Sequence, residues 1–255
     1  MLFVANGINT VTEYAPPYTG APVVVISNGV NTPVSLALDA SSNLYVANTT
    51  SNSVTEYAPP YLGAPVASIS NGVNGPAGMA FNPAGDLFIA NYSANSVTVY
   101  AQPYTGAPMM TISGGMNGPD GLVFDSSANL FVCNYASSSV GVYPAPYTTG
   151  PTTVIVNGVS GCGGLAINSA GDLFVANYNS DAVTEYAPPY TGAPVTSITN
   201  AVTQPDALTI DLLGNLFISN NGNNTVTEYA PPYTGAPFET ITNGVSSPNG
   251  LAITK

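Results

Sequence analysis

The sequence predicts an all-β fold, a six-bladed β-propeller with four-stranded antiparallel blades. A string similar to Leu-Phe-Val-Ala-Asn recurs six times at a spacing of about 43 residues, which is typical of propeller blades. It begins at Leu2, Leu44, Leu87, Leu130, Leu173 and Leu216. A run similar to Val-Thr-Glu-Tyr and a loop similar to Ala-Pro-Pro-Tyr-Thr-Gly-Ala-Pro follow each copy.

One repeat shows the four expected strands of a blade. Residues 78–82 alternate large and small side chains and predict the innermost strand, followed by strands at 87–91, 96–100 and 109–113. Turn residues such as Gly, Asp, Asn and Pro separate these runs. Both faces of the strands are apolar, as expected of a sheet packed between two neighbouring sheets.

The two ends of the chain predict how the ring closes. The chain starts in a second strand at residues 2–6 and finishes in a first strand at residues 249–254. One blade should therefore take three strands from the start and its innermost strand from the end, which pairs edges that would otherwise be free. We expect one domain over 1–255, with blades at 1–29 plus 248–255, 33–72, 76–115, 119–158, 162–201 and 205–244.

Composition excludes several classes of function. One basic residue, Lys255, stands against 13 acidic residues, and the formal net charge is −12. Nucleic acids and anionic membrane surfaces would be repelled, so neither is an expected partner. Because the chain has no His, it cannot build a Ser-His-Asp triad or a histidine metal site. We therefore favour a non-enzymatic protein.

The repeats resemble those of a known group of propellers. Each repeat contains three short patterns in a fixed order: Pro-x-Gly-hydrophobic-Ala-hydrophobic-Asp, then Gly-Asn-Leu-Phe-Val-Ala-Asn, then Asn-x-Val-Thr-Glu-Tyr. This order resembles NHL-repeat propellers and the related streptogramin-lyase-like repeats. The resemblance covers essentially the whole chain, for example 205–211 leading to 214–220. It implies a platform for protein, RNA or ligand binding, or sometimes an enzyme. Streptogramin lyases use a catalytic His and RNA-binding relatives a basic face, and this chain has neither.

Residues that recur in the repeats are assigned to architecture. The Asn that ends each second strand is expected to bond the amides of the following loop. These residues are Asn6, Asn48, Asn91, Asn134, Asn177 and Asn220. The Tyr that ends each third strand is expected to pack between blades, with its hydroxyl on a polar partner. The third-strand glutamates are expected to be solvated, namely Glu13, Glu56, Glu185 and Glu228.

The Pro-Pro-Tyr loops allow two interpretations. The favoured one has each Tyr folding back over its own blade edge; the other makes the loops a repeated surface for self-association or for a sugar polymer. The tyrosines concerned are Tyr18, Tyr61, Tyr104, Tyr147, Tyr190 and Tyr233.

Departures from the repeat predict the functional site. Tyr92, Tyr135 and Tyr178 follow the second strand in three consecutive blades, where the other blades have Gly7, Thr49 and Asn221. The x position of Pro-x-Gly, at the mouth of the central channel, is expected on the same face. It is Val34, Ala77, Asp120, Gly163, Asp206 and Asn249 in the six blades.

We predict a ligand site there formed by Tyr92, Tyr135, Tyr178, Asp120, Asp206 and Asn249. Aromatic faces and acidic acceptors suit the C–H and O–H groups of a glycan, and a protein is the other expected ligand. Inheritance of the same Tyr by recent duplication of blades is an equally weighted explanation.

No cofactor is expected, and Ca²⁺ is a weak possibility. Asp120 and Asp206 supply the oxygen ligands that Ca²⁺ needs, but they lie two blades apart and are expected to be too distant to share one ion. A lactonase- or lyase-like enzyme with a metal at the channel mouth is the rival function. A self-assembling structural repeat is the third.

Two cysteines, Cys133 and Cys162, are expected near this same face. We favour two separate buried thiols over a disulfide. The chain shows no signal-like segment, so we expect either a removed leader or a domain of a longer protein, located outside the cell or at its surface.

Overall fold

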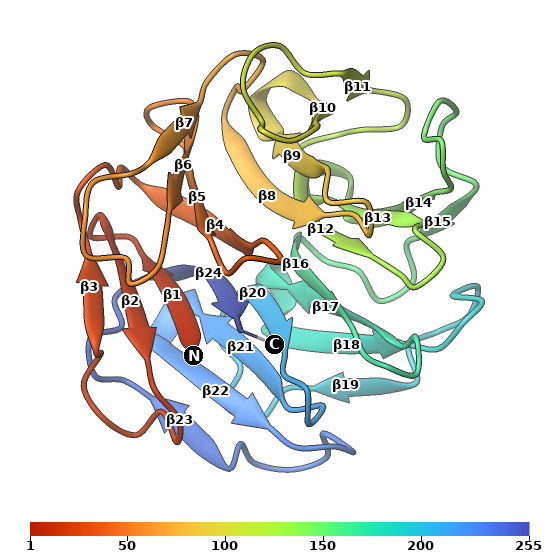
Figure 1. Ribbon diagram of the computed structural model, residues 1–255. Coiled ribbons are helices and arrows are strands. Elements are labelled where there is room, and N and C mark those ends of the chain that lie inside the picture. The colour runs from red at the N-terminus through yellow and green to blue at the C-terminus, as the bar shows by residue number, and fades with distance from the viewer. Residues whose placement is uncertain (255) are drawn as a thin grey trace.

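The computed structural model describes residues 1–254 and confirms the six-bladed propeller (Figure 1). Six four-stranded antiparallel sheets surround a central channel. The innermost strands are β4 (Pro33–Leu38), β8 (Pro76–Phe81), β12 (Pro119–Phe124), β16 (Cys162–Ile167), β20 (Pro205–Ile210) and β24 (Pro248–Ile253). The second strands are β1 (Leu2–Asn6), β5 (Leu44–Asn48), β9 (Leu87–Asn91), β13 (Leu130–Asn134), β17 (Leu173–Asn177) and β21 (Leu216–Asn220).

The outer half of each blade consists of a five-residue third strand and a three-residue fourth strand. The third strands are β2 (Thr10–Tyr14), β6 (Ser53–Tyr57), β10 (Ser96–Tyr100), β14 (Ser139–Tyr143), β18 (Ala182–Tyr186) and β22 (Thr225–Tyr229). The fourth strands are β3 (Val24–Ile26), β7 (Ala67–Ile69), β11 (Met110–Ile112), β15 (Thr153–Ile155), β19 (Thr196–Ile198) and β23 (Glu239–Ile241). Four short 3-10 helices follow second strands: η1 (Tyr92–Ala94), η2 (Tyr135–Ser137), η3 (Tyr178–Ser180) and η4 (Asn221–Asn223).

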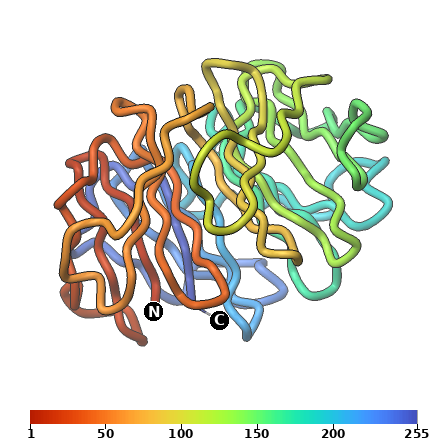
Figure 2. The backbone as a smooth tube through the Cα atoms, turned by 45° about the horizontal axis from the view of Figure 1, so that its top comes forward, coloured from red at the N-terminus to blue at the C-terminus, as the bar shows by residue number. Residues whose placement is uncertain are grey.

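The predicted closure of the ring is confirmed. β24 pairs antiparallel with β1, placing Ile253 opposite Leu2 and Leu251 opposite Val4. Beyond the strands, the Thr254 amide donates to the Met1 carbonyl at 2.9 Å. Both ends of the chain therefore lie on the same face of the ring (Figures 1 and 2). We call this the lower face, and the face that carries η1–η4 the upper face.

The core lies between the blades, because every second strand is buried along its whole length. The third-strand tyrosines pack as predicted: Tyr57 is 1% exposed, and its hydroxyl donates to the Asn28 carbonyl at 2.7 Å. Asn28 precedes β4 in the loop that leaves the first blade, so this bond crosses the boundary between two blades. Tyr14 makes the equivalent bond to Asn243 at 2.8 Å, which ties the first blade to the last.

The Pro-Pro-Tyr tyrosines follow the favoured interpretation, with a different packing partner. Tyr61 is 7% exposed and meets Phe3 of the preceding blade edge-on, with ring centroids 5.1 Å apart. Its hydroxyl donates to the Ser42 carbonyl at 2.7 Å, in the turn between the first two strands of its own blade. The ring therefore closes a seam between blades. Self-association of these loops stays a prediction, and the buried rings are not available to it.

The strand-end asparagines are structural, but their loop partner differs from the prediction. Asn48 accepts the amide of Asn31 at 2.7 Å, and Asn31 lies in the loop before the innermost strand rather than after the second. Its amide group donates to the Val46 carbonyl at 3.0 Å and to the Thr55 hydroxyl at 2.9 Å. Each side chain thus holds the loop that feeds the channel.

The prediction that the third-strand glutamates are solvated is wrong for Glu13 and Glu228, which are 6% and 4% exposed. Glu13 lies opposite Phe3 in the register of β1 and β2, on the side that Tyr61 of the next blade covers. Burial of Glu228 raises its pKa to about 7, with further contributions from the negative charges of Asp211 and Glu239.

Candidate functional site

A β-bulge at the start of each innermost strand shapes the upper mouth of the channel. In β12, Pro119 pairs with Asn134 and Leu122 with Val132, so Asp120 and Gly121 together face one residue of β13. Such a bulge bends the strand and redirects the side chain at the extra position. The residue at position x of Pro-x-Gly is therefore set apart from the ladder in every blade.

Glycines after the bulge let neighbouring innermost strands touch through their backbones. A Cβ atom on Gly78 would collide with the Asp120 carbonyl oxygen, and one on Gly164 would lie 2.6 Å from the Asp206 carbonyl oxygen. Any side chain at these positions would force the strands apart. The upper mouth is therefore narrow, and the side chains at position x are crowded into it.

Asp120 and Asp206 are brought into electrostatic contact at this mouth. Only Gly163, which has no side chain, occupies position x in the blade between them, and a Cβ there would lie 3.1 Å from Asp206 Oδ1. Burial raises the pKa of Asp120 to about 7. Burial, together with the negative charge of Asp120, raises the pKa of Asp206 well above the ordinary range. The pair can therefore hold a proton near neutral pH.

Three of the predicted tyrosines form a continuous arc on the upper face. The rings of Tyr92 and Tyr135 have centroids 6.3 Å apart, and those of Tyr135 and Tyr178 are 6.4 Å apart. Each residue begins a 3-10 helix, η1, η2 or η3, which holds the side chain at the same height in consecutive blades. Tyr92 is 40% exposed, and the other two are half-buried.

The arc ends beside the carboxyl pair. The pKa of Tyr178 is raised first by burial and then by the negative charges of Asp206 and of Tyr135 when ionised. Tyr178 therefore lies within electrostatic reach of both the arc and the channel mouth. The structure thus gathers five of the six predicted residues into one region of the upper face.

The sixth predicted residue, Asn249, is held by other partners. Its Oδ1 accepts from Asn221 Nδ2 at 2.6 Å, and its amide donates to the Pro33 carbonyl at 3.3 Å. Asn221 stands in η4 of the last blade, where the arc has tyrosine, and its bond to Asn249 on β24 joins that blade to the first. Asn221 was not among the predicted site residues, although its position in the repeat is that of the arc tyrosines and places it on the same face.

The prediction of two separate thiols is wrong, because Cys133 and Cys162 form a disulfide. Cys133 lies in β13, Cys162 begins β16 in the next blade, and their Cα atoms are 5.6 Å apart. Face-to-face stacking of the blades brings the second strand of one against the first strand of the next, as the shared core cluster of both residues shows. The bond joins the two blades that carry Tyr135 and Tyr178.

Among residues 1–254, no group of three or more His, Cys, Asp and Glu side chains is placed to hold a metal ion. Calcium binding by Asp120 and Asp206 stays a weak prediction. Within the same residues, no helix has the length and apolar character needed to cross a membrane.

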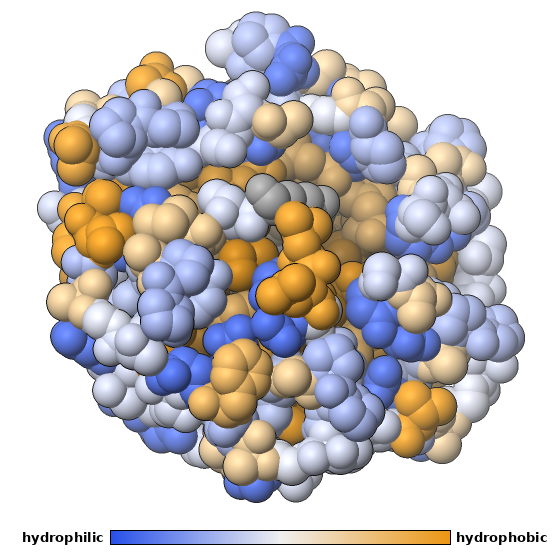
Figure 3. Space-filling model, turned by 60° about the horizontal axis from the view of Figure 1, so that its bottom comes forward, coloured by the Kyte–Doolittle hydropathy of each residue, from blue (hydrophilic) through white to orange (hydrophobic). Residues whose placement is uncertain are grey.

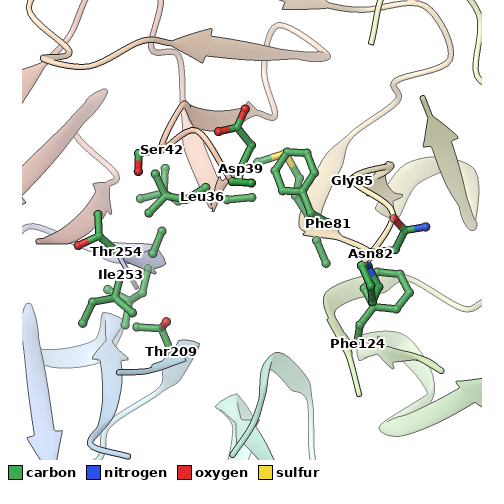
Figure 4. A pocket seen from close by; sticks show the side chains of 18 of the residues that line it. Leu36, Asp39, Ser42, Phe81, Asn82, Gly85, Phe124, Thr209, Ile253 and Thr254 are labelled. Carbon is green, nitrogen blue, oxygen red and sulfur yellow. The ribbon is translucent and has the colours of Figure 1, made fainter. Parts of the chain in front are cut away.

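A cavity lies at the lower mouth, where the sequence predicted no site. Its volume is about 890 Å³, and Figure 4 shows Leu36, Phe81, Phe124 and Ile253 around it. The innermost strands end there on a large apolar residue in every blade. These residues are Leu38, Phe81, Phe124, Ile167, Ile210 and Ile253, and all are partly exposed.

Comparison with known proteins shows the fold and leaves the activity open. No family model and no curated protein matches the sequence. A Bacteroides caccae protein of unknown function matches with 12% identity and TM-score 0.78, covering 98% of this chain and 97% of that one.

Two solved structures with known names share the architecture. The catalytically inactive virginiamycin B lyase from Staphylococcus aureus with Quinupristin matches with 13% identity and TM-score 0.65, covering 88% of this chain and 74% of that one. A chain of the nidogen/laminin complex matches with 15% identity and TM-score 0.75, covering 98% and 96%. The predicted likeness to streptogramin lyases is therefore confirmed for the fold, which lyases and binding propellers share.

Proposed function

We propose that this protein is a non-enzymatic extracellular binding propeller whose upper face takes a glycan. The observation that carries the proposal is the arc of Tyr92, Tyr135 and Tyr178, with neighbouring rings 6.3 and 6.4 Å apart, ending beside two carboxyls. Sugars offer C–H faces that stack on aromatic rings and hydroxyls that bond to carboxyl groups. The disulfide agrees with an oxidising compartment outside the cell.

A glycan fits this face because the mouth offers both hydrogen-bonding polarities. A carboxyl that keeps its proton near neutral pH donates, and its ionised partner accepts. Both act in a narrow, partly desolvated mouth, where a hydrogen bond that involves charge is strong. The chain has no arginine or histidine with which to hold an anionic substrate.

A glycan array followed by calorimetry tests this proposal. We expect wild-type protein to bind a defined group of glycans, and the double variant Tyr92→Ala with Tyr135→Ala to bind them about five- to tenfold more weakly. Phe238→Ala is the matched control, because it removes an aromatic ring that is 59% exposed and lies outside the arc. A blank array would contradict a glycan site on the arc, and so would equal weakening of glycan binding by Phe238→Ala. Capture of a protein by wild type but not by the double variant would indicate a protein ligand at the arc instead.

The raised pKa of Asp120 favours one second candidate, a lactonase- or lyase-like enzyme. A carboxyl with a pKa of about 7 is suited to general acid or base catalysis at neutral pH. Asp120→Asn and Asp206→Asn would each abolish turnover of a lactone or ester substrate in that case. Glycan binding that persists without turnover in wild type would favour the binding propeller over the enzyme.

A further inference from the structure

The lower mouth of the channel carries a cavity on the face opposite the tyrosine arc. Its cavity of about 890 Å³ falls in the size range of pockets for small organic ligands. The wall is mixed: Met79, Phe81, Phe124, Leu251 and Ile253 supply its apolar part, and polar side chains supply the rest. Figure 3 views this face obliquely and shows apolar side chains around its hollowed centre, with hydrophilic loops outside them.

One blade breaks the symmetry of this face with two protruding leucines. Leu212 and Leu213 are 78% and 82% exposed, the highest values among the exposed large apolar side chains. They lie in the turn between β20 and β21, where the other blades have Ala, Ser or Pro. The cavity wall takes only Thr209 from this blade, and the two leucines add exposed apolar surface on the same face of the ring.

Fixed negative charge lies in the turns of the lower face, and two of these carboxylates, Asp39 and Asp125, line the cavity. Each turn between an innermost and a second strand along the chain holds one Asp bonded to one Asn, as in Asp39 with Asn43 at 2.9 Å. The five aspartates are Asp39, Asp86, Asp125, Asp172 and Asp211. In three of these turns the carboxylate accepts backbone amides; Asp39 Oδ1, for example, accepts two, both at 2.8 Å. In the other two turns the carboxylates of Asp86 and Asp172 accept the side-chain amide of the Asn.

The charge reaches the wall of the cavity. Tyr104 lines it, and the pKa of Tyr104 is raised by burial and by the carboxylates of Asp39, Glu56 and Asp86. Within residues 1–254, the cation at this mouth is the Met1 amine, which donates to Thr254 Oγ1 at 2.5 Å. Lys255 lies outside the described residues. Carboxylates thus outnumber that amine several times over.

We propose that the lower cavity binds a small amphipathic cation, an apolar group that carries an ammonium or guanidinium charge. The apolar part lies against the ends of the innermost strands, and the charged head remains at the lip among the aspartates. This arrangement satisfies both halves of the ligand, because apolar area leaves water while the cation stays solvated and attracted. An apolar anion of the same length would meet repulsion at the same lip.

Calorimetry with decyltrimethylammonium and decyl sulfate, each below its micelle concentration, tests the proposal. We expect the ammonium to bind with a stoichiometry of about one and the sulfate to bind at least about tenfold more weakly. Raising NaCl from about 0.02 M to about 0.5 M should weaken only the ammonium. Equal binding of the two surfactants, or binding of neither, would overturn the proposal.

Variants locate the binding on this face. Leu212→Ser with Leu213→Ser alters only exposed side chains and should weaken the ammonium about tenfold. Asp39→Asn with Asp125→Asn should weaken it about two- to tenfold. Asn already fills this turn position in two other blades, so the turns remain supported.

The matched control removes one charge from the opposite mouth. Asp181 lies on the upper face, where its side chain accepts a backbone amide. Four other blades have Asn at this position, and Asn52, for example, accepts the equivalent amide at 2.6 Å. Asp181→Asn should therefore keep the bond and remove only the charge. We expect no change in ammonium binding. If Asp181→Asn weakened ammonium binding as much as Asp39→Asn with Asp125→Asn, the effect would come from net charge alone, and the proposed site would be overturned. Unchanged thermal melting by circular dichroism verifies that all variants are folded.

Discussion

Replacement of the buried Glu228 by Gln should stabilise the protein in a pH-dependent way. The Glu228 side chain is 4% exposed, and burial raises its pKa from 4.5 to about 7. A folded-state pKa above the unfolded value means that folding takes up a proton between pH 4.5 and 7. Stability associated with Glu228 is therefore present below pH 4.5 and is lost as the pH rises through about 7.

The size of the effect follows from the two pKa values. The difference corresponds to at most about 3.4 kcal/mol. Relaxation of the surroundings and penetration of water around the ionised side chain reduce the expected stabilisation to roughly 1–2 kcal/mol at pH 8. For a chain of this length that is about 2–6 °C in Tm. At pH 4 the protonated Glu and the Gln are equivalent, so the difference should vanish.

Thermal unfolding followed by circular dichroism at pH 4, 6 and 8 measures the difference. Glu239→Gln is the control, because it removes one negative charge from the outer strand of the same blade. We expect a change in Tm less than half that of Glu228→Gln. A Glu228→Gln variant that is less stable than wild type at pH 8, or equally shifted at pH 4 and pH 8, would refute the account of Glu228 as a buried charge.

Three further predictions concern the disulfide, the carboxyl pair and the loop caps. Cys133→Ala with Cys162→Ala opens a loop of sequence separation 29 and should lower the free energy of unfolding by about 2–4 kcal/mol, measured in guanidinium. Asp120→Asn should lower the pKa of Asp206, because a neighbouring negative charge is removed. In an NMR titration that detects the side-chain carboxyl carbon, an unchanged midpoint for Asp206 would contradict this. Asn48→Ala leaves the Asn31 amide without its acceptor and should cost about 1–3 kcal/mol, whereas an unchanged urea midpoint would argue against the cap.

Much of the fold could be predicted because the repeat encodes it locally. The spacing of the Leu-Phe-Val-Ala-Asn strings set the number of blades, and the strands at residues 2–6 and 249–254 predicted the closing pair. Burial of Glu13 could not be predicted from its own strand. Alternation placed it on one side of β2, but only the stacking of the next blade shows that Tyr61 covers that side.

The candidate site was predicted in part, from positions where one or more blades depart from the repeat. The arc of Tyr92, Tyr135 and Tyr178 stood out by substitution, and the structure brings its members together. The interaction of Asp120 and Asp206 could not be anticipated, because it depends on close backbone approach and on the missing side chain of the blade between them.

The disulfide and the lower cavity escaped prediction for different reasons. Cys133 and Cys162 lie on different blades, so their pairing depends on how neighbouring sheets stack. The apolar residues that end the innermost strands recur in all six blades, so the sequence does not distinguish them from core residues, although four of them, including Leu38, line the lower cavity.

The central claim is that the tyrosine arc binds ligand, and NMR of ring-labelled tyrosine tests it most directly. The chain has 16 tyrosines and no tryptophan, so each arc ring is assigned by comparison with its Phe variant. Titration with the strongest array glycan should shift the ring signals of Tyr92, Tyr135 and Tyr178 and leave buried tyrosines such as Tyr57 unmoved. A saturating glycan that leaves the three arc signals in place would contradict the claim.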